Sequence, residues 1–218
     1  KLPISTHQVI IGSLVGSGLA SGAAVNFTAI LEIIVSWIIS PLVAFFSALF
    51  LYKAMEKTIS KLSLFRIERI LRSLLLLSGI LIAYNTGANE LATILGPVIH
   101  SGLMEHMRAS LIGSLFVFLG AVILSHRVIE TIGKGITTLD PYSGFAAQCG
   151  AGICVMFFTI LGMPISTTYC IIGGISGVGM SKGMETVKLD LIKKIIANWF
   201  LAPSLAFLIS FLIMKAVS

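Results

Sequence analysis

Two short stretches of hydroxyl-bearing side chains, each following a proline, have the chemistry to bind an anion. One is Pro3-Ile4-Ser5-Thr6, and the other, Pro164-Ile165-Ser166-Thr167-Thr168, lies 161 residues further on. If each stretch opens a helix, its free N–H groups and hydroxyls converge on one point, where the helix dipole adds about half a positive charge. Plain capping of the two helices after a turn-forming proline is the alternative.

The two stretches belong to a longer internal repeat. Gly12, Gly18 and Gly22 recur at the same offset as Gly173, Gly179 and Gly183, and after a one-residue slip Trp37, Pro41 and Lys53 recur as Trp199, Pro203 and Lys215. Such repeats are typical of secondary transporters, which bind their substrate where two related halves meet. We therefore expect one anion site formed by both copies: Ser5, Thr6 and His7 from the first, and Ser166, Thr167 and Thr168 from the second.

A carboxylate and an amide, Glu90 and Asn89, interrupt an otherwise apolar run. An ionisable side chain at membrane depth is costly and usually functional. Glu90 is suited to bind Na+ through its oxygens or to carry a proton; the alternative is a carboxylate at an interfacial helix end. We expect the helix to unwind near Thr86. The predicted cation ligands are Asn85, Asn89, Glu90 and Thr93, with Ser5 and Ser166 from the two prolyl stretches.

The composition identifies an integral membrane protein. Hydrophobic residues make up 56% of the chain, charged residues 11%, and the mean hydropathy is +1.03, whereas soluble domains carry roughly 25% charged residues. The net charge of +6 comes from short loops between apolar runs, so we expect no nucleic-acid partner. Three cysteines without a CxxC spacing support neither a disulfide framework nor a zinc site; Cys149, Cys154 and Cys170 are expected to be small buried residues.

The apolar runs predict an all-α fold with spanning helices at 32–52, 70–95, 110–125 and 192–214. Residues 144–161 and 167–179 fit a re-entrant hairpin over about 141–180, because the second arm, at roughly 13 residues or about 20 Å, is short for a hydrocarbon core of about 30 Å. Residues 5–19 would be the second arm of an equivalent hairpin. The fold class is an inverted-repeat secondary transporter with two re-entrant hairpins and broken helices.

We divide the chain into the end of repeat one (1–53), a basic linker (54–69) and repeat two (70–218). Most basic residues fall on the side of the Lys53–Arg72 loop, which makes that side cytoplasmic and puts the C-terminus outside the cell membrane. We expect the N-terminal half of the transporter to be missing from this chain; a split transporter is the alternative. Small-residue faces at Gly12/Gly16 and Gly173/Gly177 suit either a homodimer or, as we favour, hairpin packing.

Several motifs together resemble the inorganic phosphate transporter (PiT) family. They are Gly87-Ala88-Asn89-Glu90-Leu91-Ala92-Thr93 with Gly96-Pro97, the stretch from Thr131 to Ala147, and the two prolyl stretches. The resemblance implies two re-entrant hairpins and ion-coupled import of phosphate, generally with Na+ and with no further cofactor. It also implies that phosphate sits between the Ser/Thr tips, and that Asn89 and Glu90 help to bind cations and substrate.

The chain departs from the family pattern at several site positions. The pattern usually has Asp at Glu90 and Asn at Thr93, Thr and His at His7 and Gln8, His at Tyr169, and Glu at Gln148. These changes keep open a permease for sulfate or another oxyanion, with H+ in place of Na+. A membrane enzyme acting on phosphorylated lipids lacks support, because no paired Asp cluster or nucleophile–base arrangement is seen, and a passive channel is a further alternative. Sodium-coupled phosphate import by alternating access is the leading prediction.

Overall fold

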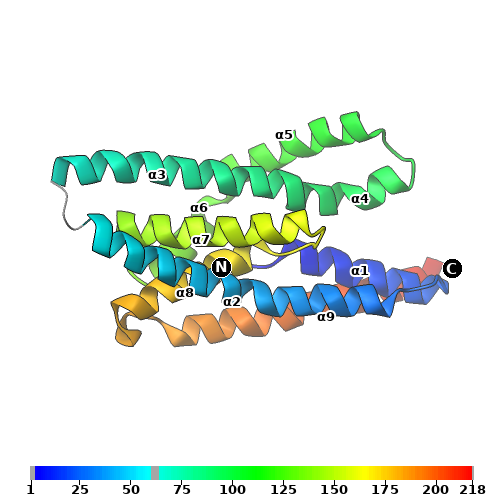
Figure 1. The fold of residues 1–218 in the computed structure, drawn as a ribbon. Helices are drawn as coiled ribbons and strands as arrows, with labels where there is room; N and C mark the ends of the chain where they lie inside the picture. Colours follow the sequence, from blue (N-terminus) through cyan, green and yellow to red (C-terminus); the bar gives the residue numbers. More distant parts are fainter. Residues whose placement is uncertain (1–2, 60–63, 218) are drawn as a thin grey trace.

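The computed structural model describes residues 3–59 and 64–217, and within these ranges the protein is helical, with no strand. The elements are α1 (Thr6–Ser21), α2 (Phe27–Ile59), α3 (Leu64–Asn85), the π-helical η1 (Thr86–Leu91), α4 (Ala92–His100), α5 (His106–Leu124), α6 (His126–Gly135), α7 (Pro141–Ile160), α8 (Thr167–Lys182), the 3₁₀ turn η2 (Met184–Thr186) and α9 (Leu189–Val217). Figure 1 shows the longer helices lying side by side as an elongated bundle.

Four helices within the described ranges are long and apolar enough to cross a membrane: Phe27–Thr58, His106–Leu124, Pro141–Ile160 and Leu189–Val217. Three of them match the spans predicted at 32–52, 110–125 and 192–214, the second ending one residue earlier than predicted. The run predicted at 70–95 forms α3, η1 and α4 without a break. Most of the proposed linker 54–69 is helical; its residues 60–63, which include Lys61, lie outside the described residues, as do Lys1 and Leu2.

Residues 141–182 form a pair of helices joined by a short irregular tip, as the sequence predicts for the second hairpin. The chain leaves α7 through Gly162, whose φ of 72° is left-handed, and enters α8 after Ser166. Helix α8 has 16 residues, or about 24 Å, slightly longer than expected but still short of a full span. Cys154 and Cys170 are buried between the two arms, in agreement with their expected role as small core residues.

The two copies of the repeat pack on each other reciprocally. A Cβ built on Gly12 of α1 would lie 2.5 Å from the Pro203 carbonyl oxygen of α9, and one on Gly173 of α8 would lie 2.2 Å from the Pro41 carbonyl oxygen of α2. Each hairpin arm thus lies against the proline-containing long helix of the other copy, at a distance that only glycine allows. These glycines therefore serve packing within the chain, the alternative that we favoured over dimerisation.

Helices α1 and α8 start near the middle of the bundle and run in opposite directions (Figure 1). Helix α1 lies along α9, and α8 lies along α2. This arrangement is compatible with the inverted repeat predicted from the sequence. It brings the N-terminal ends of α1 and α8, with their prolyl stretches, into the interior of the bundle.

A polar cluster closes the base of the second hairpin. Asp140 caps α7 by accepting a hydrogen bond from the Ser143 N–H at 2.9 Å. Lys182, at the end of α8, donates to Asp140 Oδ2 at 2.5 Å and to the Thr138 carbonyl at 2.9 Å. Although burial opposes ionisation, the hydrogen bonds from Lys182 and Ser143 hold the pKa of Asp140 below its usual value of 3.8. The cluster ties the end of one hairpin arm to the start of the other.

We expect Gly173→Ala to lower the free energy of unfolding by about 1–3 kcal/mol, the usual cost of overpacking, since the new methyl group collides with backbone of α2. Thermal unfolding in detergent would measure this. Gly120→Ala in α5 is the matched control, because its Cβ meets no atom within 4 Å and alanine favours the helix. Equal stability of the two variants would show that α8 and α2 do not approach so closely.

We expect the charge of Asp140 to contribute stability at neutral pH that disappears in acid. Because its pKa is lowered on folding, this contribution is present above the unfolded-state pKa and is lost as the pH falls through the folded-state pKa. Asp140→Asn keeps a capping oxygen, so the variant should be less stable than wild type at pH 7 by under about 1 kcal/mol, since the side chain is partly exposed. The difference in the free energy of unfolding should shrink as the pH falls below 3.8; a difference that does not change with pH would contradict the role of the charge.

Candidate functional site

The two prolyl stretches form matching helix starts. Ser5 caps α1 by accepting a hydrogen bond from the Gln8 N–H at 3.5 Å, and Ser166 caps α8 by accepting one from the Tyr169 N–H at 3.3 Å. Both serines are buried, each with 2% exposure. Capping, the alternative weighed above, is therefore real. It does not exclude anion binding, because a serine hydroxyl that accepts one bond still has a proton to donate.

Other polar atoms at the tips are buried without a partner in the described part of the chain. They are Nε2 of His7 and Oγ1 of Thr167. A buried polar group without a hydrogen bond is costly, and such groups need an explanation. Thr6 is exposed and Thr168 half-exposed. The tips thus hold more hydrogen-bonding capacity than the surrounding protein uses.

Asn89 ties the η1 segment to the tip of the second hairpin. Its Nδ2 donates to Thr159 Oγ1 at 2.9 Å and to the Met163 carbonyl at 3.0 Å, and its Oδ1 accepts from the Ile165 N–H at 3.2 Å. One side chain therefore fixes backbone on both sides of Pro164.

The same segment also reaches the tip of the first hairpin arm. The His7 imidazole lies close enough to interact with Asn89 and with the Glu90 carboxylate. The structure thus brings Ser5 and His7 of the first tip, Ser166 and Thr167 of the second, and Asn89 with Glu90 into one region.

The expectation that the helix unwinds near Thr86 is wrong. Residues Thr86–Leu91 form a π-helical turn that continues from α3 into α4, a feature often found at functional sites. The hydroxyl groups of Thr86 and Thr93 bond back to the carbonyls of Ile82 and Asn89, at 3.0 and 2.9 Å. Both hydroxyls thus bond to carbonyls of their own continuous helix.

Asn85, another predicted cation ligand, is anchored to α7. Its Nδ2 donates to the Gly152 carbonyl at 2.8 Å, while its Oδ1 is buried without a partner in the described residues. No group of three or more His, Cys, Asp and Glu side chains is found within the described ranges. The region offers hydroxyl, amide and carboxylate oxygens, the donors that hard cations prefer.

Sequence reasoning missed a direct bond between the two tips. The Tyr169 hydroxyl donates to Gln8 Oε1, and the Tyr169 ring stacks on Trp199 with centroids 3.6 Å apart. Trp37, the equivalent of Trp199 in the first copy, donates from Nε1 to the Pro164 carbonyl at 2.8 Å. The equal offset of Gln8 and Tyr169 in the repeat was the signal that could have paired them.

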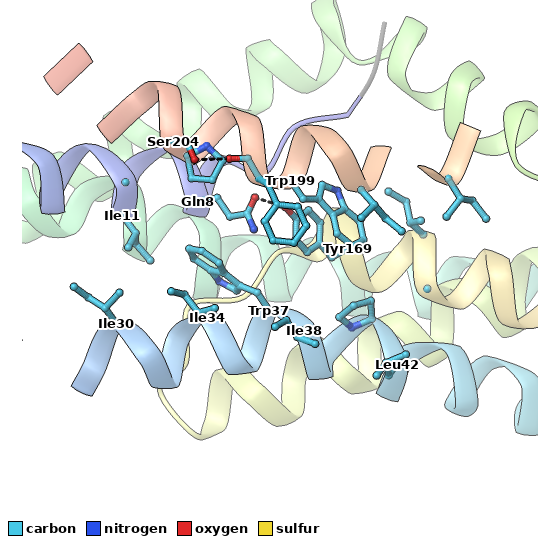
Figure 2. A pocket seen from close by; sticks show the side chains of 18 of the residues that line it. Gln8, Ile11, Ile30, Ile34, Trp37, Ile38, Leu42, Tyr169, Trp199 and Ser204 are labelled. Carbon is cyan, nitrogen blue, oxygen red and sulfur yellow. Dashed lines mark hydrogen bonds between the residues drawn. The ribbon is translucent and has the colours of Figure 1, made fainter. Parts of the chain in front are cut away.

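Gln8 and Tyr169 line an apolar groove of about 760 Å³ between the α1–α9 and α2–α8 pairs (Figure 2). Its lining residues come in equivalent pairs from the two copies, such as Trp37 with Trp199 and Pro41 with Pro203. The groove and the bond between the tips thus lie between equivalent residues of the two copies.

The architecture is that of a membrane transporter: it has apolar helices long enough to span a membrane, two packed copies of one repeat, and two buried helix starts. The chain belongs to the phosphate transporter family, whose sequence model matches residues 1–67 and 59–210. It is 42% identical over 217 residues to "Putative phosphate permease MJ0630" of Methanocaldococcus jannaschii, covering 100% of this chain and 69% of the relative.

Two further comparisons bear on fold and substrate. The chain is 34% identical over 222 residues to "Sulfate permease CysP" of Bacillus subtilis, covering 98% of this chain and 60% of that protein. The solved structure titled "The sodium-dependent phosphate transporter" matches with a TM-score of 0.84 at 22% identity, covering 99% of this chain and 74% of that one. The likeness confirms the fold. The chain is thus shorter than these relatives.

We expect Asn89→Ala to lower the free energy of unfolding by about 2 kcal/mol or more, because three hydrogen bonds are lost and the buried Ile165 N–H is left unpaired. Asn26→Ala is the matched control: Asn26 accepts one bond, from Ala29 N–H, at an exposed helix start, and should cost about 1 kcal/mol or less. Thermal unfolding of both variants would measure the contrast. An Asn89 variant no less stable than the Asn26 variant would contradict the tie to the hairpin tip.

Proposed function

We propose that the full-length protein imports inorganic phosphate together with Na+ across the cell membrane by alternating access. The observation that carries this proposal is the meeting of two serine-capped helix N-termini, one from each copy, beside Asn89 and Glu90. Membership of the phosphate transporter family supports phosphate as the substrate. The names of the Methanocaldococcus relative and of the structural neighbour agree with it.

In this proposal the anion lies between the two tips. Ser5 and Ser166 donate their hydroxyl protons, and the free N–H groups of Thr6 and Thr167 add donors backed by two helix dipoles. The unpartnered His7 Nε2 and Thr167 Oγ1 would gain a partner when the anion binds. Thr168 is a further predicted substrate ligand. Asn89 is also in the predicted set, but its two Nδ2 protons bond to Thr159 and Met163, so it would have to release one of them to donate to the anion.

The coupling cation would bind at Asn89 and Glu90, with oxygens of Asn85, Thr93, Ser5 and Ser166 as further ligands. Phosphate carries net negative charge at neutral pH, and moving charge through hydrocarbon is costly. Cotransported Na+ would offset that charge as well as supply the driving gradient. A proton carried by Glu90 is the alternative coupling ion.

One residue at each tip is more exposed than its equivalent in the other copy, which suggests what the rest of the full-length protein contributes. Ile165 is fully buried, whereas its equivalent Ile4 is 56% exposed. His7 is buried beside Glu90, whereas its equivalent Thr168 is half-exposed. Because the relatives are longer than this chain, we propose that a counterpart of the Asn89–Glu90 segment covers these positions. We also predict that the Lys53–Arg72 side is cytoplasmic and that the C-terminus is external. A homodimer is a further prediction.

Sulfate is the second candidate substrate. It is favoured by the 34% identity to a protein named a sulfate permease and by the departures from the family pattern at His7, Gln8 and Tyr169. Sulfate does not protonate near neutral pH, whereas phosphate does. A substrate affinity that changes between pH 6 and 8 would therefore favour phosphate.

The test is uptake of radiolabelled phosphate into proteoliposomes that hold the full-length protein, with and without an inward Na+ gradient and with excess sulfate as competitor. Na+-dependent uptake that sulfate does not block would support the proposal. Phosphate uptake that is absent, or displaced by sulfate, would overturn phosphate as the substrate.

We expect Glu90→Gln to abolish Na+-stimulated uptake while the protein stays folded, because the amide cannot neutralise the cation. Glu105→Gln is the matched control, since Glu105 is 72% exposed and paired with Arg108 at a helix start. The ratio of uptake with and without the Na+ gradient would be measured for both. A normal ratio in the Glu90 variant would remove this carboxylate from the coupling mechanism.

We expect the double variant Ser166→Ala/Thr167→Ala to raise the KM for the anion by about tenfold or more, because hydrogen bonds to a charged group contribute about 1.5–3 kcal/mol each. Ser73→Ala is the control, because the exposed Ser73 hydroxyl donates within its own helix, to the Arg69 carbonyl. An unchanged KM in the double variant would leave capping as the whole role of the second tip.

A further inference from the structure

Gln8 and Tyr169 form a hydrogen bond between the two copies of the repeat. They occupy equivalent positions, 161 residues apart, in the first turns of α1 and α8. Tyr169 donates its hydroxyl hydrogen to Gln8 Oε1, and the two residues are only 1% and 5% exposed. The bond is therefore buried and joins one hairpin tip directly to the other.

Two helix N-termini that face each other repel. Each carries the equivalent of about half a positive charge, and the repulsion is strongest when no anion lies between them. A bond across the gap opposes separation of the tips in the empty site. A site that keeps its bound geometry when empty binds more tightly, because less ordering is needed on binding.

We propose that the Gln8–Tyr169 hydrogen bond is a positioning bond that holds the two tips at the spacing the anion requires. The inference rests on the proposed anion site between the tips. Neither residue needs to touch the anion.

Aromatic side chains pack beside the pair in both copies. Tyr169 stacks on Trp199 of the same copy, with ring planes 23° apart. Trp37 holds the equivalent place in the first copy and lines the groove with Gln8. Figure 2 shows Gln8 and Tyr169 facing each other, with Trp37 and Trp199 beside them. A tyrosine at position 8 would thus find a tryptophan on which to stack.

This near-symmetry gives a sharp test in the full-length protein. Gln8→Leu/Tyr169→Phe removes both polar groups and keeps the apolar shape, so its thermal midpoint should stay near that of wild type, since no partner is left unsatisfied. Its KM for the transported anion should rise about three- to tenfold, as expected for one lost hydrogen bond. The exchanged variant Gln8→Tyr/Tyr169→Gln rebuilds the bond in reverse and should return the KM to within about twofold of wild type.

Tyr84→Phe is the matched control, because Tyr84 is 62% exposed and its variant should keep the wild-type KM. A wild-type KM in the Leu/Phe variant would overturn the inference. So would a KM that follows the thermal midpoint through all variants, or an exchanged variant that folds but binds as weakly as the Leu/Phe variant.

The measurements use phosphate and sulfate in parallel. If the wild-type protein transports sulfate alone, the proposed substrate fails, and the KM values of the same variants for sulfate decide the role of the bond. If it transports phosphate and the Leu/Phe variant keeps its KM, the proposed function stands and the positioning role fails.

Discussion

The structure depends on the close approach of each hairpin arm to a long helix of the other copy. Irregular backbone survives at membrane depth only where protein buries it or where it lines a wet cavity. Because residues 12 and 173 are glycines, the backbones of α1 and α8 can lie against the backbone carbonyls of α9 and α2, closer than any residue with a Cβ atom would allow. This packing places the starts of α1 and α8 inside the bundle, where Ser5 and Ser166 are buried.

A second constraint acts on the tips themselves. Asn89 bonds to backbone on both sides of Pro164 and lies beside His7 of the other tip. The segment that carries Glu90 is therefore mechanically connected to both helix starts. A cation bound at Glu90 would act on the geometry of the proposed anion site through this connection, which is a physical route by which two substrates can be coupled.

The frame of the site is nearly symmetric, but its chemistry is not. Both copies keep the capping serine and the tryptophan, whereas His7 stands opposite Thr168 and Gln8 opposite Tyr169. Capping and packing impose the same requirements on both helix starts, so these residues match. The side chains that face the shared space have no such requirement, and there the two copies have diverged.

The sequence by itself determined the membrane class, most helices, the second hairpin and the serine-capped helix starts at the two tips. These follow from local properties: apolar run length, proline breaks, capping residues and an internal repeat. Only the tertiary structure decided that residues 86–91 form a π turn, that Asn89 forms hydrogen bonds to the hairpin tip and that Gln8 bonds to Tyr169. Those features depend on which helices approach each other and at what depth. Residues about 80 or 160 positions apart come into contact only when the helices have packed. A local sequence pattern therefore does not show which of them will bond.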